Sequence, residues 1–198
     1  ESFSVKMTGG PDGDVAGNEL KILYEKYKNT CKVVAVADGY GAAYDPSGLD
    51  WGEIIRLVKE GKSICYFNKS KLSKKSGSFV LKVDTVENIE KRNKIHSVVK
   101  ADLLIPAGGR PYTVRKENAE EFFLEDGTNS CRAIVEGANI FFTDKAREIL
   151  QNKGILNSDL PSLSLKNPEQ VYGKKRITAL ADQGLDLNKS FKDIGYTV

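Results

Sequence analysis

Apolar positions near the start of the chain change period twice, from strand-like to helix-like and back. Residues 4–7 form a short β-type stretch, and residues 31–37 are almost uniformly apolar, which is typical of a parallel strand buried on both faces. Between them, four apolar residues share one helical face because they are spaced by four, three and four: Ala16, Leu20, Leu23 and Tyr27. The pattern predicts a strand, a loop, a helix and a second strand.

The alternation continues along the chain. A second helical stripe has Asp50 as its candidate N-cap and Gly61 as its candidate stop. The stripe comprises Trp51, Ile54, Ile55 and Val58. Strand-like runs follow at residues 79–83, 101–106 and 132–136, and Gly154 ends a last helix that packs through Ala146, Ile149 and Leu150.

Strands that alternate with helices predict an α/β fold with a Rossmann-type, doubly wound, mostly parallel sheet. We expect helices on both faces of the sheet. We expect the strand order to reverse between the strand that ends at Met7 and the one that ends near Ile105. Glycine-bearing turns follow three of the strands, at the edge where open sheets bind ligands.

The glycine-rich segment at residues 8–18 joins the first strand to the first helix. Glycines there let the backbone approach a phosphate, and the free N–H groups and dipole of the helix N-terminus favour its charge. Aligned with the G-x-G-x-x-G/A pattern, Gly13 is the second glycine and Ala16 the third. Pro11 stands where the first belongs, so Gly10 must supply the tight turn. A glycine turn without a ligand is the alternative. A phosphate-binding NTPase loop fits less well, because no Gly-Lys-Ser/Thr follows.

Asp38 ends the second strand, about 25 residues beyond the glycine segment. An acidic residue at this place can accept hydrogen bonds from the hydroxyls of an adenosine ribose. Its alternative role is that of a turn former before Gly39. The combination of strand, loop, helix, strand and terminal acid favours a dinucleotide site.

Composition limits the other function classes. With 198 residues, 40% of them apolar, the chain can bury one large core, and a net charge of +3 indicates no obligatory nucleic-acid or membrane partner. The lysine-rich residues 68–78 contain no aromatic side chains, which favours a solvated loop. Cys31, Cys65 and Cys131 are far apart, which favours buried thiols in a reducing interior, either cytoplasm or mitochondrial matrix.

No other catalytic or metal-binding constellation stands out. His96 is the single histidine, so it has no second histidine with which to bind a metal, and we expect a partly buried helix or loop residue. No apolar run approaches transmembrane length. Because the sequence starts with Glu1 and a strand follows almost at once, we expect it to be part of a longer chain.

Taken in order, several segments closely resemble the cofactor domain of long-chain, NAD-specific glutamate dehydrogenases. They are residues 8–18 (TGGPDGDVAGN), 37–41 (ADGYG), 44–49 (YDPSGL), 105–111 (IPAGGRP) and 135–143 (VEGANIFFT). The resemblance covers roughly residues 4–155. It implies the reversible oxidative deamination of L-glutamate to 2-oxoglutarate and ammonia, with NAD as the hydride acceptor.

The resemblance also implies roles for individual residues. It assigns the pyrophosphate to Gly10, Gly13, Asp14, Val15 and Ala16. It places Asp38 on the adenosine ribose, Ala107 and Gly108 along the cofactor, and Asn139 at the nicotinamide ribose. For Asn139, a turn or a cap of the helix at 143–153 is the alternative, and Arg110 suits a surface salt bridge or a cofactor contact equally well.

A departure from the resemblance limits the activity expected of this chain. The family's catalytic lysine and aspartate lie in a separate substrate domain that has no counterpart here, so we expect NAD binding without turnover, no catalytic residue and no metal site. In the full enzyme we expect glutamate and 2-oxoglutarate as substrates and a homo-oligomer. We divide the chain into an NAD-binding domain, residues 1–156, and a polar helical tail of unassigned role, residues 157–198. A non-catalytic NAD-sensing module and the cofactor domain of another amino-acid dehydrogenase are the alternatives.

Overall fold

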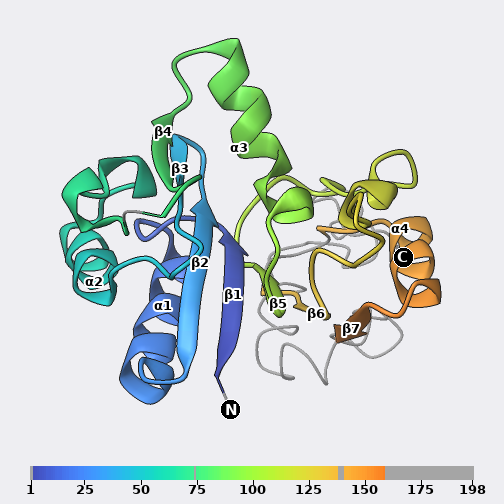
Figure 1. Cartoon of the computed structure of the whole chain (residues 1–198), viewed down its shortest axis with the longest axis horizontal. Coiled ribbons are helices and arrows are strands. Elements are labelled where there is room, and N and C mark those ends of the chain that lie inside the picture. The colour runs from blue at the N-terminus through green and yellow to red at the C-terminus, as the bar shows by residue number, and fades with distance from the viewer. Residues whose placement is uncertain (1, 74, 138–140, 159–198) are drawn as a thin grey trace, which may run out of the picture. The chain divides into compact units, whose positions relative to one another are not determined.

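The computed structural model describes residues 2–73, 75–137 and 141–158 (Figure 1). Its strands are β1 (Phe3–Thr8), β2 (Cys31–Ala37), β3 (Gly41–Tyr44), β4 (Phe79–Lys82), β5 (Leu103–Pro106), β6 (Ala133–Val135) and β7 (Leu156–Ser158). Its helices are α1 (Asp14–Tyr27), α2 (Trp51–Glu60), α3 (Val86–Val98) and α4 (Asp144–Asn152), with short 3-10 turns η1 (Ile64–Tyr66), η2 (Lys69–Lys71) and η3 (Ala119–Phe122). The predicted tail lies outside the described residues from residue 159 onward.

The strands form one sheet in the order β4-β3-β2-β1-β5-β6-β7. β1 is parallel to β2 on one side and to β5 on the other, and β5 is parallel to β6. The chain therefore builds outward from β1 in both directions. This confirms the α/β fold, the mostly parallel sheet and the predicted reversal of strand order between β1 and β5.

One side of the sheet departs from the parallel pattern, because β3 is antiparallel to both β2 and β4. Only Asp38, Gly39 and Tyr40 separate β2 from β3. A parallel crossover needs a dozen or more residues, so this spacer permits only a hairpin. Gly41 fits the crowded start of β3, where a Cβ would overlap the carbonyl oxygen of Leu81.

Helices cover both faces of the sheet. Ala16 and Leu20 of α1 and Ile54 of α2 pack in one core with Val5 and Met7 of β1. On the opposite face, α3 packs over β2 to β4, and α4 packs in a second core with β5 and β6. Tyr27, predicted on the buried stripe of α1, is instead 46% exposed and contacts the ring of Phe3 edge-on.

The helix ends follow local rules of capping. The Asp50 side chain accepts a hydrogen bond from the Glu53 N–H at 2.9 Å, and Gly61 ends α2 with a φ of 59°, as predicted. The cap of α4 is Thr143, whose hydroxyl accepts from the Ala146 N–H. Asn139, an alternative candidate for a cap in this region, lies outside the described residues.

Lys6 alternates with Val5 and Met7 in β1 and points to the other face, where it is completely buried. Its Nζ donates to the Val99 carbonyl at 2.7 Å, to the Ser130 hydroxyl at 2.9 Å and to the Ser130 carbonyl at 3.2 Å. Burial lowers the pKa of Lys6 to about 8. These bonds tie β1 to the end of α3 and to the segment before β6.

His96 of α3 belongs to the same buried region. Its ring packs against Phe122 and Phe141, with centroid distances of 5.9 and 5.5 Å. Burial, and secondarily the charge of Lys6, lowers the pKa of His96 to about 4, so the imidazole is neutral at pH 7. The expectation of a partly buried helix or loop residue is confirmed in that His96 lies on a helix, and its side chain is more deeply buried than expected.

Candidate functional site

The glycine segment forms a tight loop between β1 and α1. Gly9 has a φ of 99°, and a Cβ there would lie 2.9 Å from main-chain atoms of Ala107 and Gly108. Gly13 donates its N–H to the Gly10 carbonyl at 2.9 Å and then serves as the N-cap of α1 without a side-chain bond. The first-turn N–H groups of α1 therefore open onto the loop.

The loop meets the turn after β5 directly. The Thr8 hydroxyl donates to the Gly108 carbonyl at 2.6 Å, and the Ala107 N–H donates to the Thr8 carbonyl at 2.8 Å. The Gly9 N–H donates to the last carbonyl of β2 at 2.8 Å. The structure thus brings Gly10, Gly13, Ala107 and Gly108 together at the carboxyl ends of β1 and β5, where the strand order reverses.

Asp38 lies at the neighbouring end of β2, with its side chain almost fully buried. Its Oδ1 accepts from the Tyr40 and Gly41 N–H groups at 2.8 and 3.0 Å, and its Oδ2 accepts from the Ile64 N–H at 2.7 Å. The Ser63 hydroxyl lies 2.9 and 2.8 Å from the two oxygens. Three N–H groups and one hydroxyl thus surround this carboxylate.

Two residues distant in sequence complete the end of β2. Ser63 precedes η1, and Arg92 of α3 donates through one Nη to the Asp38 carbonyl at 2.7 Å. Nothing in the local pattern around either residue pointed to this strand end. Only the fold brings them to Asp38.

Asp12 is a second acidic residue at this place and was not among the predicted site residues. A Cβ on Gly10 would lie 2.5 Å from Asp12 Oδ1 and would overlap Asp38 Oδ2, so both carboxylates lie against the same glycine. Partial burial, and secondarily the charge of Asp38, raises the pKa of Asp12. A side chain at position 10 would clash with these two carboxylates, so the loop requires glycine there on steric grounds alone.

The remaining predicted residues differ in their exposure, and one of them is not described. Asp14 and Val15 are exposed in the first turn of α1, whereas Ala16 is buried beneath the loop. Asn139 lies outside the described residues, but Glu136 of the same turn is buried and forms an ion pair with Arg147 of α4 at 2.9 Å. Arg110 is exposed and forms no ion pair with the described residues.

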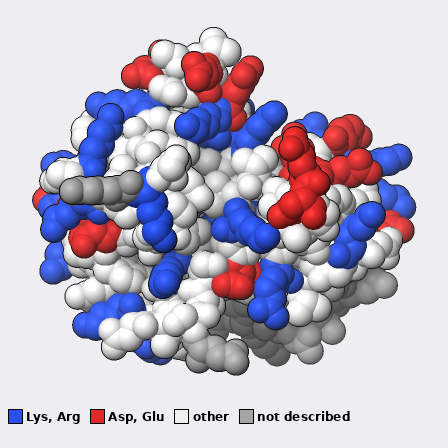
Figure 2. Space-filling view, viewed as in Figure 1, with Lys and Arg blue, Asp and Glu red and all other residues white. Residues whose placement is uncertain are grey.

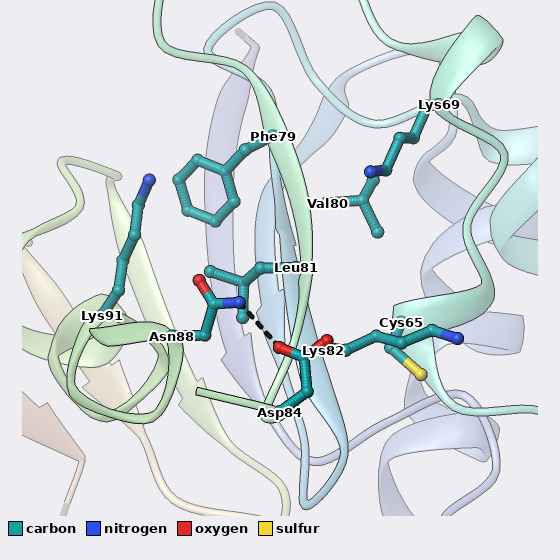
Figure 3. A pocket seen from close by; sticks show the side chains of 9 residues that line it. All are labelled: Cys65, Lys69, Phe79, Val80, Leu81, Lys82, Asp84, Asn88 and Lys91. Atoms are coloured by element: carbon teal, nitrogen blue, oxygen red, sulfur yellow. Dashed lines mark hydrogen bonds between the residues drawn. The ribbon is translucent and has the colours of Figure 1, made fainter. Parts of the chain in front are cut away.

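A pocket of about 370 Å³ lies along the outer edge strand β4 (Figure 3). Its polar lining comprises Lys69, Lys82, Lys91, Asp84 and Asn88. The Asn88 amide donates to the Asp84 carboxylate at 3.0 Å, and Lys91 Nζ lies 3.8 Å from the centre of the Phe79 ring. No residue of the glycine loop lines this pocket, so it is distinct from the meeting point of the strand ends.

The described residues show no sign of a metal site or a membrane-spanning helix and, on the face in Figure 2, no single basic stripe. On the face shown in Figure 2, lysines and arginines are interrupted by acidic side chains rather than forming one basic stripe. Within the described ranges, no three His, Cys, Asp or Glu residues come close enough to bind a metal ion. In the same part of the chain, no helix has the length and apolar character needed to cross a membrane.

Known proteins resemble this chain in sequence and in fold. It is 40% identical over 160 residues to a probable NAD-specific glutamate dehydrogenase of Schizosaccharomyces pombe, and 40% identical over 165 residues to glutamate dehydrogenase 2 of Dictyostelium discoideum. Each alignment takes in 76% of this chain, but only 14% and 15% of the respective relatives.

Among solved structures, a glutamate dehydrogenase of Plasmodium falciparum matches with a TM-score of 0.52 at 19% identity. The match covers 78% of this chain and 29% of that one. A hetero-hexameric glutamate dehydrogenase of Thermus thermophilus gives a TM-score of 0.51 at 20% identity and covers 79% and 29% of the two chains. These likenesses show the shared fold. The sequence model of the Glutamate/Leucine/Phenylalanine/Valine dehydrogenase family matches residues 4–159. The chain belongs to this family of dehydrogenases.

Proposed function

We propose that this chain is the NAD-binding domain of an NAD-dependent glutamate dehydrogenase. The observation that carries the proposal is the meeting of the glycine loop with the turn after β5, where the strand order reverses. Open α/β sheets bind dinucleotides in the crevice at this point. The names of the related NAD-specific enzymes support both the cofactor and the substrate.

The proposed cofactor lies across the carboxyl edge of the sheet. Its pyrophosphate is bound by the main chain of the loop and the first turn of α1: Gly10, Gly13, Asp14, Val15 and Ala16. A Cβ on Gly13 would meet only the Gly10 carbonyl at 3.3 Å and Ala16 at 3.9 Å, so the space over Gly13 is bounded by little else. That open space beside free N–H groups fits a phosphate.

The proposal extends to both ends of the cofactor. The adenosine ribose lies at Asp38, at the end of β2. Ala107 and Gly108 lie along the cofactor after β5, and Asn139 binds at the nicotinamide ribose. Bound NAD supplies a hydride acceptor, and these residues of the chain orient it.

For the parent enzyme, we propose the deamination of L-glutamate to 2-oxoglutarate and ammonia in a homo-oligomer. The catalytic lysine and aspartate of this family have no proposed counterpart in residues 1–198. The lysine polarises the reacting carbon and the aspartate transfers protons. The 198-residue chain therefore binds cofactor without turning over glutamate.

The test uses the purified 198-residue chain. NADH fluorescence or calorimetry should show saturable binding, and no steady production of NADH should appear with glutamate and NAD at saturation. A chain that is folded by circular dichroism but binds no NADH would refute the cofactor site. Steady NADH production would instead reveal a catalytic site within these residues.

A further inference from the structure

We propose that Asp12 supplies the carboxylate oxygens that bind the hydroxyls of the adenosine ribose, and that Asp38 positions the strand end beside it. Asp12 is then a residue that determines the choice of NAD over NADP. The inference rests on the proposed function of the glycine loop, and it reassigns a role that the resemblance places on Asp38.

The surroundings of Asp38 leave little of its carboxylate for a ligand. A carboxylate has about four sites at which it accepts hydrogen bonds. The N–H groups of Tyr40, Gly41 and Ile64 and the hydroxyl of Ser63 occupy the equivalent of four. A ribose hydroxyl could bind Asp38 only by displacing one of these donors, and a buried donor left without a partner destabilises the complex.

Asp12 has the opposite character. It is exposed on the loop between Gly10 and Gly13, and its carboxylate accepts no hydrogen bond from any other residue within 2–73, 75–137 or 141–158. Its Oδ1 lies against Gly10, next to Oδ2 of Asp38. Asp12 therefore offers free acceptors at the strand end where the adenosine ribose is proposed to lie.

The pair of carboxylates also accounts for selectivity. Two vicinal ribose hydroxyls can donate to one open carboxylate, as at the acidic position of NAD-binding folds. A 2′-phosphate in the same place would meet the charge of Asp12 directly and the charge of Asp38 behind it. Replacing Asp12 should thus weaken NADH binding and relieve the repulsion of NADPH.

The experiment compares Asp12→Asn, Asp38→Asn and the wild-type chain by titration with NADH and NADPH at fixed salt. Glu25→Gln is the matched control, because it removes one exposed negative charge from the far part of α1. For Asp12→Asn we expect NADH affinity to fall about tenfold and NADPH affinity to rise severalfold, with the melting temperature unchanged. For Asp38→Asn we expect chiefly a lower melting temperature, because the amide keeps one acceptor oxygen but turns an NH2 group toward donors whose hydrogen bonds the second carboxylate oxygen accepts in the wild-type chain.

The outcomes separate this inference from the proposed function. If the wild-type chain binds neither dinucleotide, the cofactor site itself is wrong. If the wild-type chain binds NADH, the ratio of NADH affinity to NADPH affinity decides the role of Asp12. An equal ratio in Asp12→Asn and Glu25→Gln would show that Asp12 does not bind the ribose. A folded Asp38→Asn variant that alone changes the ratio would return that role to Asp38.

Discussion

Lys6 in the interior and Asp12 at the strand ends differ in how many of their possible hydrogen bonds are made within the chain. Lys6 is completely buried, and its Nζ has three acceptors within 3.2 Å. Asp12 is exposed and has no donor from another described residue. Both side chains have a perturbed pKa, for Lys6 a lowered one and for Asp12 a raised one.

A perturbed pKa indicates a ligand site only where the hydrogen-bonding capacity of the group is still free. Shifted pKa values concentrate at functional sites, but networks that hold a structure together produce them as well. The ammonium of Lys6 has no donor left over, so its cluster holds β1 to α3. Free acceptors at the carboxyl edge, rather than the size of a pKa shift, mark the proposed cofactor site.

The largest expected effect separates the two groups by stability. Lys6→Ala removes a completely buried side chain and leaves the carbonyls of Val99 and Ser130 without their donor, so the free energy of unfolding should fall by about 3–5 kcal/mol. Urea unfolding measures the change. Lys94→Ala, an exposed position on α3, should have little effect. NADH affinity of the folded fraction should be unchanged, and a selective loss of affinity would place Lys6 in the site.

The next effect falls mainly on binding. Gly13→Val brings a branched side chain into the space proposed for the phosphates, so NADH affinity should fall by about 100-fold or more, or roughly 3 kcal/mol. The φ of −84° at Gly13 is one that any residue adopts, but its Cβ would lie 3.3 Å from the Gly10 carbonyl oxygen, so that carbonyl must shift by a few tenths of an ångström. Calorimetry with NADH measures the loss. Gly39→Ala is the control, since a Cβ there meets nothing within 4 Å. Unchanged affinity in a folded Gly13→Val chain would mean that the loop holds no phosphate.

Much of the fold could be predicted because periodicity reports burial. The apolar run at 31–37 predicted β2 with correct bounds, the helical spacing of Ala16, Leu20 and Leu23 predicted α1, and the expected reversal of strand order lies between β1 and β5. The antiparallel β3 was missed, although the three-residue spacer after Ala37 contained the signal. Tyr27 was misplaced because helical spacing alone does not show where the sheet beneath a helix ends.

The site could be predicted only in part, because hydrogen-bond partners come from distant segments. The glycine loop and Asp38 are visible as local motifs. Ser63 and Arg92 are not, since they reach Asp38 from 25 and 54 residues away. Asp12 lies within the glycine motif, but its proposed role depends on the hydrogen bonds that already occupy the Asp38 carboxylate. Only the structure shows those bonds.

A third expected effect concerns the buried His96, which lies in the interior near the charge of Lys6. The pKa of His96 is about 4 in the folded chain against about 6.5 for a free imidazole. Between these values the unfolded chain binds a proton that the folded chain does not, so stability falls as pH drops from 6.5 toward 4. The loss from this one group should reach about 1–3 kcal/mol. His96→Phe, which keeps an aromatic ring beside Phe122 and Phe141, should flatten this part of the profile in urea midpoints. Equal slopes for both chains would show that His96 is protonated in the folded state.

The smallest expected effect concerns Thr8, a polar residue at the strand ends whose hydroxyl already donates a hydrogen bond within the chain. The Thr8 hydroxyl donates to the Gly108 carbonyl at 2.6 Å and so joins the glycine loop to the turn after β5. Thr8→Val keeps the shape but removes the donor, so the free energy of unfolding should fall by about 1 kcal/mol. Because the two loops then lose one link, NADH affinity should fall only about two- to fivefold. Thr8→Ser retains the hydroxyl and should restore both values. A loss of affinity as large as that of Gly13→Val would mean that Thr8 itself contacts the cofactor, and the division between filled structural groups and open binding groups would fail at this residue.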